Sequence, residues 1–244
     1  MLRRVFAISV AVIALTGSAF AADMPVKAPV YNAPAVYNWA GLYIGGQIGG
    51  VWAHDNGSIV NPGVPVAIDL PFTADATGVI GGGHIGYNWQ IGQWVIGVEG
   101  SVDWTSLKKD FFVGVCPLFC GAATTKSDWQ GSARGRVGWA FDQILLYVTG
   151  GWAFANITNT YDTTVFGGGF ASISGTRSGW TVGGGADYAL NKNWSLRAEY
   201  RYSDFGSFAD QSSVAFFPAT RVNRHITESQ AQVGFSYKFD GFGG

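Results

Sequence analysis

Eight segments of the chain alternate apolar residues with polar or small ones, and this alternation constrains the fold more than any other feature. Successive side chains of a β-strand point to opposite faces, so the pattern predicts strands with one apolar and one polar face. The segments are residues 41–52, 78–89, 94–104, 129–141, 145–157, 179–190, 194–202 and 227–239. No segment of similar length has a convincing helical period.

The connections between these segments alternate between short and long. The short ones are residues 90–93, 142–144 and 191–193, where Gly92, Asp142 and Asn191 suit tight turns. The four others have about 18 to 25 residues, which compact soluble domains seldom contain without internal structure. Outer-membrane barrels combine tight periplasmic turns with long outer loops. The sequence therefore predicts an all-β fold, an eight-stranded antiparallel transmembrane β-barrel in up-and-down meander order.

Alternation alone does not say which face points outward, because a soluble barrel alternates too, with its apolar side chains inside. Two features favour an apolar exterior. The middles of the apolar faces are small or aliphatic, and tryptophans lie near strand ends, where they would form girdles at two membrane interfaces. The predicted girdle residues are Trp39, Trp52, Trp89, Trp94, Trp104, Trp129, Trp180 and Trp194.

The opposite faces of the strands contain acidic and basic residues in similar number. The predicted interior network consists of Glu99, Asp103, Arg134, Arg136, Asp187, Arg197, Glu199, Arg201 and Lys238. Charges removed from water need partners, and eight strands enclose an interior that side chains fill. The pattern favours a paired network over an open channel. A gate whose ion pairs switch partners and let ions pass is the functional alternative.

The N-terminus has the layout of a secretory signal, with Arg3 and Arg4 before an apolar run and small residues ending at Ala21. We therefore expect a cleaved signal peptide at 1–21, a Pro-rich periplasmic leader at 22–38, the barrel at 39–239 and a short tail at 240–244. Removal of residues 1–21 changes the formal charge from −1 to −3, a balance that argues against a nucleic-acid partner.

Three further patterns in the sequence resemble functional sites. Cys116 and Cys120 lie in a long connection of an exported chain, which suggests a candidate disulfide and, without nearby histidines, no zinc site. Gly81, Gly83 and Gly86 match the dinucleotide fingerprint, but they fall inside a strand with no helix after them, so no cofactor is expected. The interior carboxylates have no nucleophile motif beside them, which predicts a protein that is not an enzyme.

The last long connection mixes aromatic and basic residues: Phe216, Phe217, Arg221, Arg224 and His225. Such a mixture could contact haem, a lipopolysaccharide phosphate or a host surface. The plainer interpretation is a solvated loop.

Several motifs resemble a known family. They are AFAAD at the end of the signal, NWAGLYIGGQIGG, GHIGYNWQIGQWVIGVEG, SARGRVGWAF and the closing VGFSYKF. Together they resemble the small outer-membrane immunogenic proteins of alphaproteobacteria, a porin-like family of eight-stranded barrels. The resemblance implies contact with outer-membrane lipids and lipopolysaccharide, a part in envelope integrity, and host or haemin binding in some members. Family barrels usually end on an aromatic residue, whereas five residues follow Phe239 here.

The hypothesis from the sequence is thus a structural outer-membrane protein that displays surface loops. Its rivals are a narrow porin-like channel for small solutes or ions, and a surface receptor for haemin or host molecules.

Overall fold

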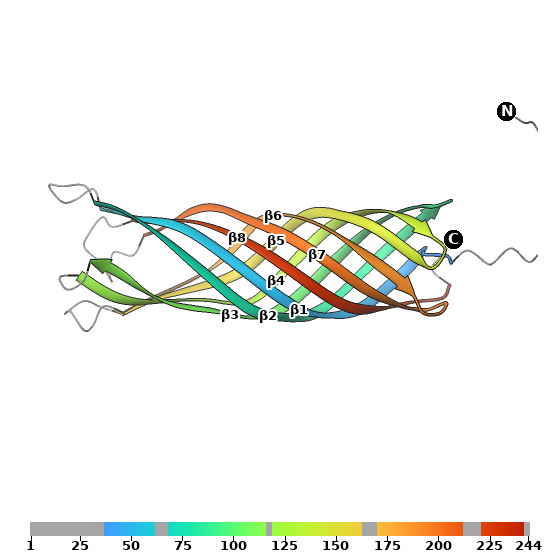
Figure 1. Ribbon diagram of the computed structural model, residues 1–244, viewed down its shortest axis with the longest axis horizontal. Coiled ribbons are helices and arrows are strands. Elements are labelled where there is room, and N and C mark those ends of the chain that lie inside the picture. Colours follow the sequence, from blue (N-terminus) through green and yellow to red (C-terminus); the bar gives the residue numbers. More distant parts are fainter. Residues whose placement is uncertain (1–36, 62–67, 116–118, 163–169, 212–220, 242–244) are drawn as a thin grey trace, which may run out of the picture. The chain divides into compact units, whose positions relative to one another are not determined.

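The computed structural model describes residues 37–61, 68–115, 119–162, 170–211 and 221–241. Eight strands form a closed barrel in which each pairs antiparallel with the next and β8 pairs with β1 (Figure 1). They are β1 (Gly41–Asn61), β2 (Ile68–Ile91), β3 (Trp94–Val115), β4 (Phe119–Phe141), β5 (Ile144–Asp162), β6 (Phe170–Ala189), β7 (Trp194–Gln211) and β8 (Arg221–Lys238). The predicted antiparallel meander is confirmed. The described ranges contain no helix long and apolar enough to span a membrane.

The turns between β2 and β3, β4 and β5, and β6 and β7 lie at one end of the barrel (Figure 1). The opposite ends of the strands, which border the connections that the sequence predicted to be long, lie at the other end of the barrel. Gly92 and Asp142 occupy positive-φ positions, 61° and 52°, in two of these turns. Glycine adopts this conformation freely, and aspartate tolerates it better than most residues. We call the two ends the short-turn end and the long-connection end.

The strands extend much farther toward the long-connection end than the alternation predicted. Most of the segment from His54 to Thr77, which we interpreted as a connection, is strand, and its ladder continues to Asn61 and Ile68. The prediction was wrong because main-chain hydrogen bonds keep strands paired even where the outer face no longer needs to be apolar.

Two of the eight ladders end early. The β2/β3 ladder stops at Ile80 and Thr105, and the β6/β7 ladder stops at Trp180 and Asp204, whereas the other six continue toward the long connections. At the first of these stops the Ser106 hydroxyl accepts a hydrogen bond from the Val79 amide at 2.9 Å. Between these points and the long-connection end, the wall consists of two four-stranded groups, β7–β8–β1–β2 and β3–β4–β5–β6. We call the two places where their ladders are interrupted the β2/β3 seam and the β6/β7 seam.

The outer surface of the barrel is apolar between two levels of tryptophan. Ten residues separate Trp94 from Trp104 on β3, which corresponds to roughly 33 Å of strand and, at a tilt near 40°, to about 25 Å along the barrel axis. Exposed side chains between the levels include Ile44, Ile48, Val79, Ile85, Ile96, Val98, Val137, Val148, Val182 and Val233. The predicted apolar exterior is therefore observed.

Seven of the eight predicted girdle tryptophans are exposed: Trp52, Trp89, Trp94, Trp104, Trp129, Trp180 and Trp194. Trp39 is the exception, because it is only 4% exposed and packs inside the barrel against Val95 and Leu145. Trp152, which lies in the middle of a predicted strand and was not included, is 72% exposed and pairs with Trp180 in the ladder.

The barrel interior as candidate functional site

The interior is filled in layers along the axis. At the short-turn end an apolar cluster is formed by Trp39, Val95, Ala140, Leu145, Tyr147 and Ala189. Charged side chains follow, then a layer rich in amides and hydroxyls, then a second apolar layer. Near the long-connection end, Arg224 lies inside the barrel with Asp55, Asn159 and Thr125, and we call these four residues the Arg224 cluster.

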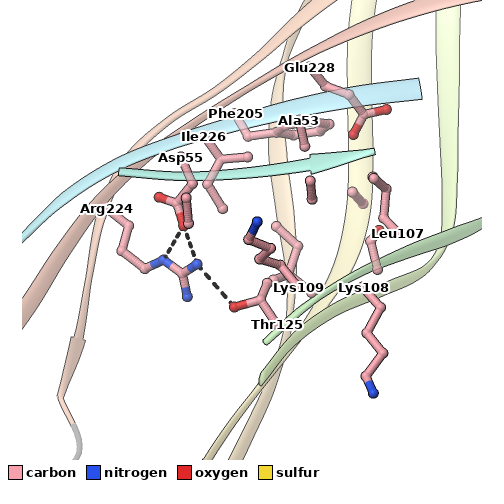
Figure 2. Close-up of a pocket in the computed structure, with 15 residues that line it drawn as sticks. Ala53, Asp55, Leu107, Lys108, Lys109, Thr125, Phe205, Arg224, Ile226 and Glu228 are labelled. Carbon is pink, nitrogen blue, oxygen red and sulfur yellow. Dashed lines mark hydrogen bonds and ion pairs between the residues drawn. The ribbon is translucent and has the colours of Figure 1, made fainter. Parts of the chain in front are cut away.

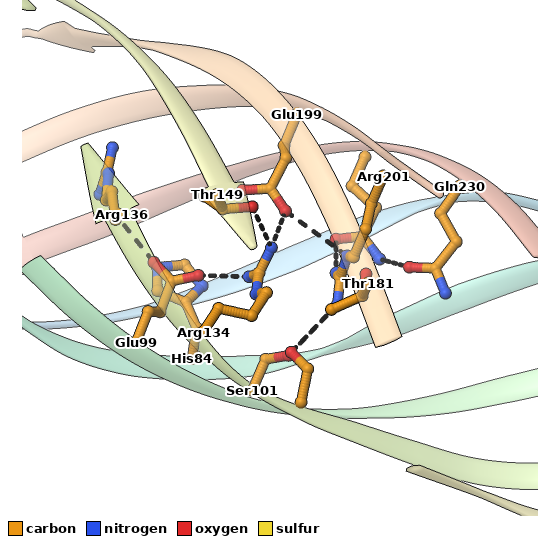
Figure 3. Close-up of polar contacts among 12 residues, drawn as sticks. His84, Glu99, Ser101, Arg134, Arg136, Thr149, Thr181, Glu199, Arg201 and Gln230 are labelled. Carbon is orange, nitrogen blue, oxygen red and sulfur yellow. Dashed lines mark hydrogen bonds and ion pairs between the residues drawn. The ribbon is translucent and has the colours of Figure 1, made fainter. Parts of the chain in front are cut away.

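Arg134 on β4 lies at the centre of the charged layer, between two carboxylates (Figure 3). Its guanidinium donates to Glu99 on β3 and, at 2.5 Å, to Glu199 on β7. Thr149 accepts a further hydrogen bond at 3.3 Å. All three charged side chains are almost fully buried, so each charge depends on the others for its partner.

Arg136 and Arg197 complete this layer by sharing the carboxylate of Asp187. Arg136 donates to Asp187 Oδ2, and the Nε of Arg197 donates to Asp187 Oδ1 at 3.2 Å. The Arg136 guanidinium also lies 3.7 Å from the ring centroid of Tyr147, whose hydroxyl donates to Glu199 at 2.9 Å. A stacked arginine of this kind keeps its charge in a low-dielectric site.

Tyr43 on β1 donates its hydroxyl hydrogen to Glu99 at 2.8 Å. The tyrosine fits because Gly86 lies opposite it in the ladder, and a Cβ at that position would lie 2.4 Å from the Tyr43 hydroxyl oxygen. Gly86 is thus required for close packing inside the barrel, and the three glycines of the fingerprint lie within β2.

Polar neutral side chains surround the next charges along the axis. Arg201 lies 3.8 Å from Asp103 and 3.5 Å from Glu199, and it donates to Gln232 at 2.9 Å. Asp103 accepts from Gln47 at 2.6 Å. His84 shares hydrogen bonds with Gln47 and Ser236 and is buried, so its ring contacts neutral groups.

Eight of the nine predicted network residues are brought together in this way; Lys238 is not. It lies at the short-turn end, donates to the main-chain oxygen of Asn38, and its ammonium is 4.6 Å from the ring centroid of Tyr37. It is the last residue of β8, and its long side chain reaches toward water.

Sequence reasoning missed several interior groups, although their parity contained the signal. Glu228 has the same parity on β8 as Gln230 and Gln232 and is only 3% exposed, and Gln230 donates to it at 2.5 Å. Tyr43 shares parity with Gln47 on β1 in the same way. The tyrosines supply hydrogen-bond donors that the carboxylates need beyond their arginine partners.

Arg224, which we assigned to an exposed loop, is buried inside the barrel. Its Nε donates to Asp55 Oδ2 at 2.9 Å, and its other nitrogens donate to Asn159 at 2.7 Å and Thr125 at 3.1 Å. Burial follows because β8 extends past the membrane and places Arg224 on its inner face. Phe216 and Phe217 from the same expectation, and Cys116 of the candidate disulfide, lie outside the described residues.

The ion pairs join opposite walls of the barrel. In a closed ring of eight strands, β3 and β7 are separated by three strands in either direction, yet Arg197 on β7 donates to Glu99 on β3 at 2.7 Å. Within the described ranges, no group of three or more His, Cys, Asp or Glu could hold a metal ion. The ion pairs neutralise the buried charges and connect strands on opposite sides of the barrel.

These features together define a class of protein. A closed antiparallel barrel with an apolar exterior, two tryptophan levels about 25 Å apart and a polar, neutralised interior is the architecture of a bacterial outer-membrane barrel. Its short-turn end corresponds to the periplasmic side of such barrels and its long-connection end to the outer side.

Comparison with known proteins agrees with this class. Residues 8–239 match the outer membrane protein beta-barrel domain family, and the chain belongs to that family. The 31 kDa outer-membrane immunogenic protein of Brucella melitensis is 34% identical over 236 residues, covering 91% of this chain and 94% of the relative. The 25 kDa outer-membrane immunogenic protein of Brucella abortus is 31% identical, covering 98% and 99%.

Among solved structures, the outer membrane protein OprG from Pseudomonas aeruginosa has the same fold, with a TM-score of 0.56 at 18% identity. The match covers 82% of this chain and 96% of OprG. The resemblance to outer-membrane immunogenic proteins noted from the motifs is therefore confirmed, and the chain is an outer-membrane protein.

Proposed function

We propose that the chain is a structural protein of the outer membrane, which stabilises the envelope and displays its long connections outward, and that it is neither an enzyme nor an open channel. The single observation that supports this most is the Arg197–Glu99 pair, which crosses the lumen between opposite strands at 2.7 Å. A side-chain bridge across the axis rigidifies the barrel and leaves no straight aqueous path.

The neighbouring layers support the same proposal. The periplasmic end is filled by Trp39 and its apolar neighbours, and the charged layer together with the adjacent Arg201 and Asp103 contains four arginines and four carboxylates. A permeating ion would have to separate buried pairs, which costs several kcal/mol per uncompensated charge.

Planar-bilayer recording of the purified full chain tests the channel alternative. We expect no conductance steps above the bare bilayer at neutral pH. The matched control is the same barrel with Glu99→Ala and Arg197→Ala, which removes both partners of the bridge and should produce small or flickering steps. Regular steps from the unaltered chain would contradict the proposal.

A deletion strain tests the structural role itself. We expect loss of the chain to increase detergent sensitivity, and a complementing copy with its four long connections shortened to restore resistance. Surface loops of a rigid scaffold tolerate change, so the barrel alone should be sufficient for the mechanical contribution. Unchanged detergent sensitivity in the deletion strain would refute the structural role.

Signal-peptide cleavage after Ala21 belongs to the same proposal. Mass spectrometry of the outer-membrane form should find a chain that begins at Ala22. Retention of residues 1–21 in that form would contradict it.

A further inference from the structure

A cavity of about 50 Å³ lies inside the outer part of the barrel, between the amide-rich layer and the Arg224 cluster (Figure 2). Most of its wall is apolar and comes from both four-stranded groups: Ala53, Ala74, Ala76, Leu107, Ala155, Ile157, Phe205 and Ile226. At about 10–15 Å³ for each water-sized group, this volume accommodates roughly three to five methylene or methyl groups.

The cavity reaches the β2/β3 seam. Its lining includes Ala74 and Ala76 on β2 and Leu107, Lys108 and Lys109 on β3, all of which lie beyond the last ladder pair of those two strands. No main-chain hydrogen bonds of a ladder close the wall there among the described residues. The seam begins directly above Trp104, at the upper tryptophan level.

The charges around the cavity are arranged asymmetrically. Arg224 and Asp55 neutralise each other through two hydrogen bonds to Asp55 Oδ2. Lys108 is 3.3 Å from Asp110 and points away from the cavity (Figure 2). Lys109 points into the cavity, and within the described residues it makes no hydrogen bond or ion pair (Figure 2).

Glu228 lies at the inner limit of the cavity and forms no ion pair among the described residues. Glu228 therefore offers a negative head group no positive partner at the inner limit, whereas Lys109 attracts it. An alkyl chain, in contrast, would replace water along the apolar wall at a gain proportional to the area covered.

We propose that this cavity binds the alkyl chain of an anionic amphiphile, with the head group held by Lys109 beside the β2/β3 seam. The shared chemistry is a short apolar chain attached to one negative charge. Two sources supply it, a free carboxylate from the medium or an anionic lipid in the outer leaflet at the level of Trp104.

The test uses the full chain in phosphatidylcholine nanodiscs, with the methyl groups of isoleucine and alanine labelled with ¹³C and hexanoate as the probe. We expect hexanoate to cause saturable shifts of the Ile157, Ile226 and Ala155 methyl signals. Hexylammonium, which has the same chain and the opposite charge, should not shift them. Equal shifts with hexylammonium would overturn the proposal.

Two variants test the head-group contact and the apolar cavity separately, and a third serves as the control. Lys109→Glu should weaken hexanoate binding at least tenfold, whereas Lys192→Glu, the same charge change at the short-turn end, should leave it unchanged. Ala155→Leu fills the cavity and should abolish the shifts. Migration that changes on boiling verifies that each variant is folded, and unchanged hexanoate binding in folded Lys109→Glu contradicts the assignment.

A second arm separates the two sources. Nanodiscs that contain phosphatidylglycerol are recorded without hexanoate. Shifts of the same methyl signals identify the membrane as a source, and shifts only with added hexanoate identify the medium. Absence of shifts in both arms overturns the proposal.

Discussion

At the scale of single residues, the interior depends on arginines that each serve more than one carboxylate. Arg134 contacts Glu99 and Glu199, and Arg197 contacts Glu99 and Asp187. The planar guanidinium presents several donors in fixed directions, which lysine does not. Loss of Arg134 or Arg197 therefore leaves two buried carboxylates with one arginine partner fewer.

Arg134→Ala should lower the free energy of unfolding by roughly 3–5 kcal/mol, because it leaves Glu99 and Glu199 buried and less well paired. Urea titration in lipid vesicles, followed by tryptophan fluorescence, measures this. Lys126→Ala, an exposed position on the same strand, is the control. The double change Arg134→Met and Glu199→Gln, which removes one charge of each sign from a contacting pair, should cost less than Arg134→Ala alone, and a larger loss would contradict the argument from unpaired charge.

Tyr147→Phe tests the hydroxyl that supports Glu199. The ring remains, so packing is preserved, but the 2.9 Å hydrogen bond to the carboxylate is lost. Hydrogen bonds to charged groups contribute about 1.5–3 kcal/mol, and we expect a loss in that range by the same titration. Tyr188→Phe, at an exposed ring, should change stability by less than about 0.5 kcal/mol. Equal effects at both positions would argue that the hydroxyl of Tyr147 is dispensable.

At the scale of strands, the odd or even numbering of residues, their parity, located the charged network. The wrong girdle assignment of Trp39 arose because its parity was ignored. Trp39 shares odd numbering with the inward residues Tyr43 and Gln47 on β1, whereas the exposed Trp52 is even. Proximity to a strand end suggested a girdle position for both. The side of the wall is set by the pleat, so the parity of Trp39 was the stronger signal.

Parity fails where a strand contains a β-bulge. In β7, Phe205 and Phe208 both contribute to the same buried apolar cluster although their numbers differ in parity, because the register shifts between Asp204 and Ser207. An inserted residue exchanges the faces beyond it. The alternation in the sequence therefore did not indicate the apolar cavity, although it predicted the parts of the strands nearer the short-turn end.

Gly206 makes this bulge feasible. Its φ is +69°, and a Cβ there would meet no atom within 4 Å, so substitution changes the backbone preference alone. Gly206→Ala should lower the free energy of unfolding by about 1–2 kcal/mol, with a smaller loss for Gly206→Asn. Gly175→Ala is the matched control, because its site is equally open and has no positive φ. A loss at Gly175 equal to that at Gly206 would show that the φ angle is not the cause.

At the scale of the whole molecule, the barrel is inverted relative to a soluble protein. Arg136 and Arg224 are among its most buried large side chains, while Val148 and Trp152 are exposed. Lipid favours this arrangement, because apolar side chains contact acyl chains, the closed ladder leaves no sheet edge across the bilayer, and the arginines of the charged layer meet carboxylates inside. Composition alone could not predict it, because the direction of the faces depends on the solvent outside.

Single-tryptophan barrels test this inversion directly. A chain that retains only Trp152 should be strongly quenched by brominated lipids, because that indole is 72% exposed at the upper level of the apolar band. A chain that retains only Trp39 should be quenched weakly, since its indole is 4% exposed and is surrounded by Val95, Ala140 and Leu145 inside the wall. Both chains replace the other tryptophans with phenylalanine, and boiling-dependent migration verifies folding. Because Trp152 faces outward and Trp39 faces inward, strong lipid quenching of Trp39 would mean that its indole contacts lipid and that the apolar cluster at the short-turn end is not inside the barrel.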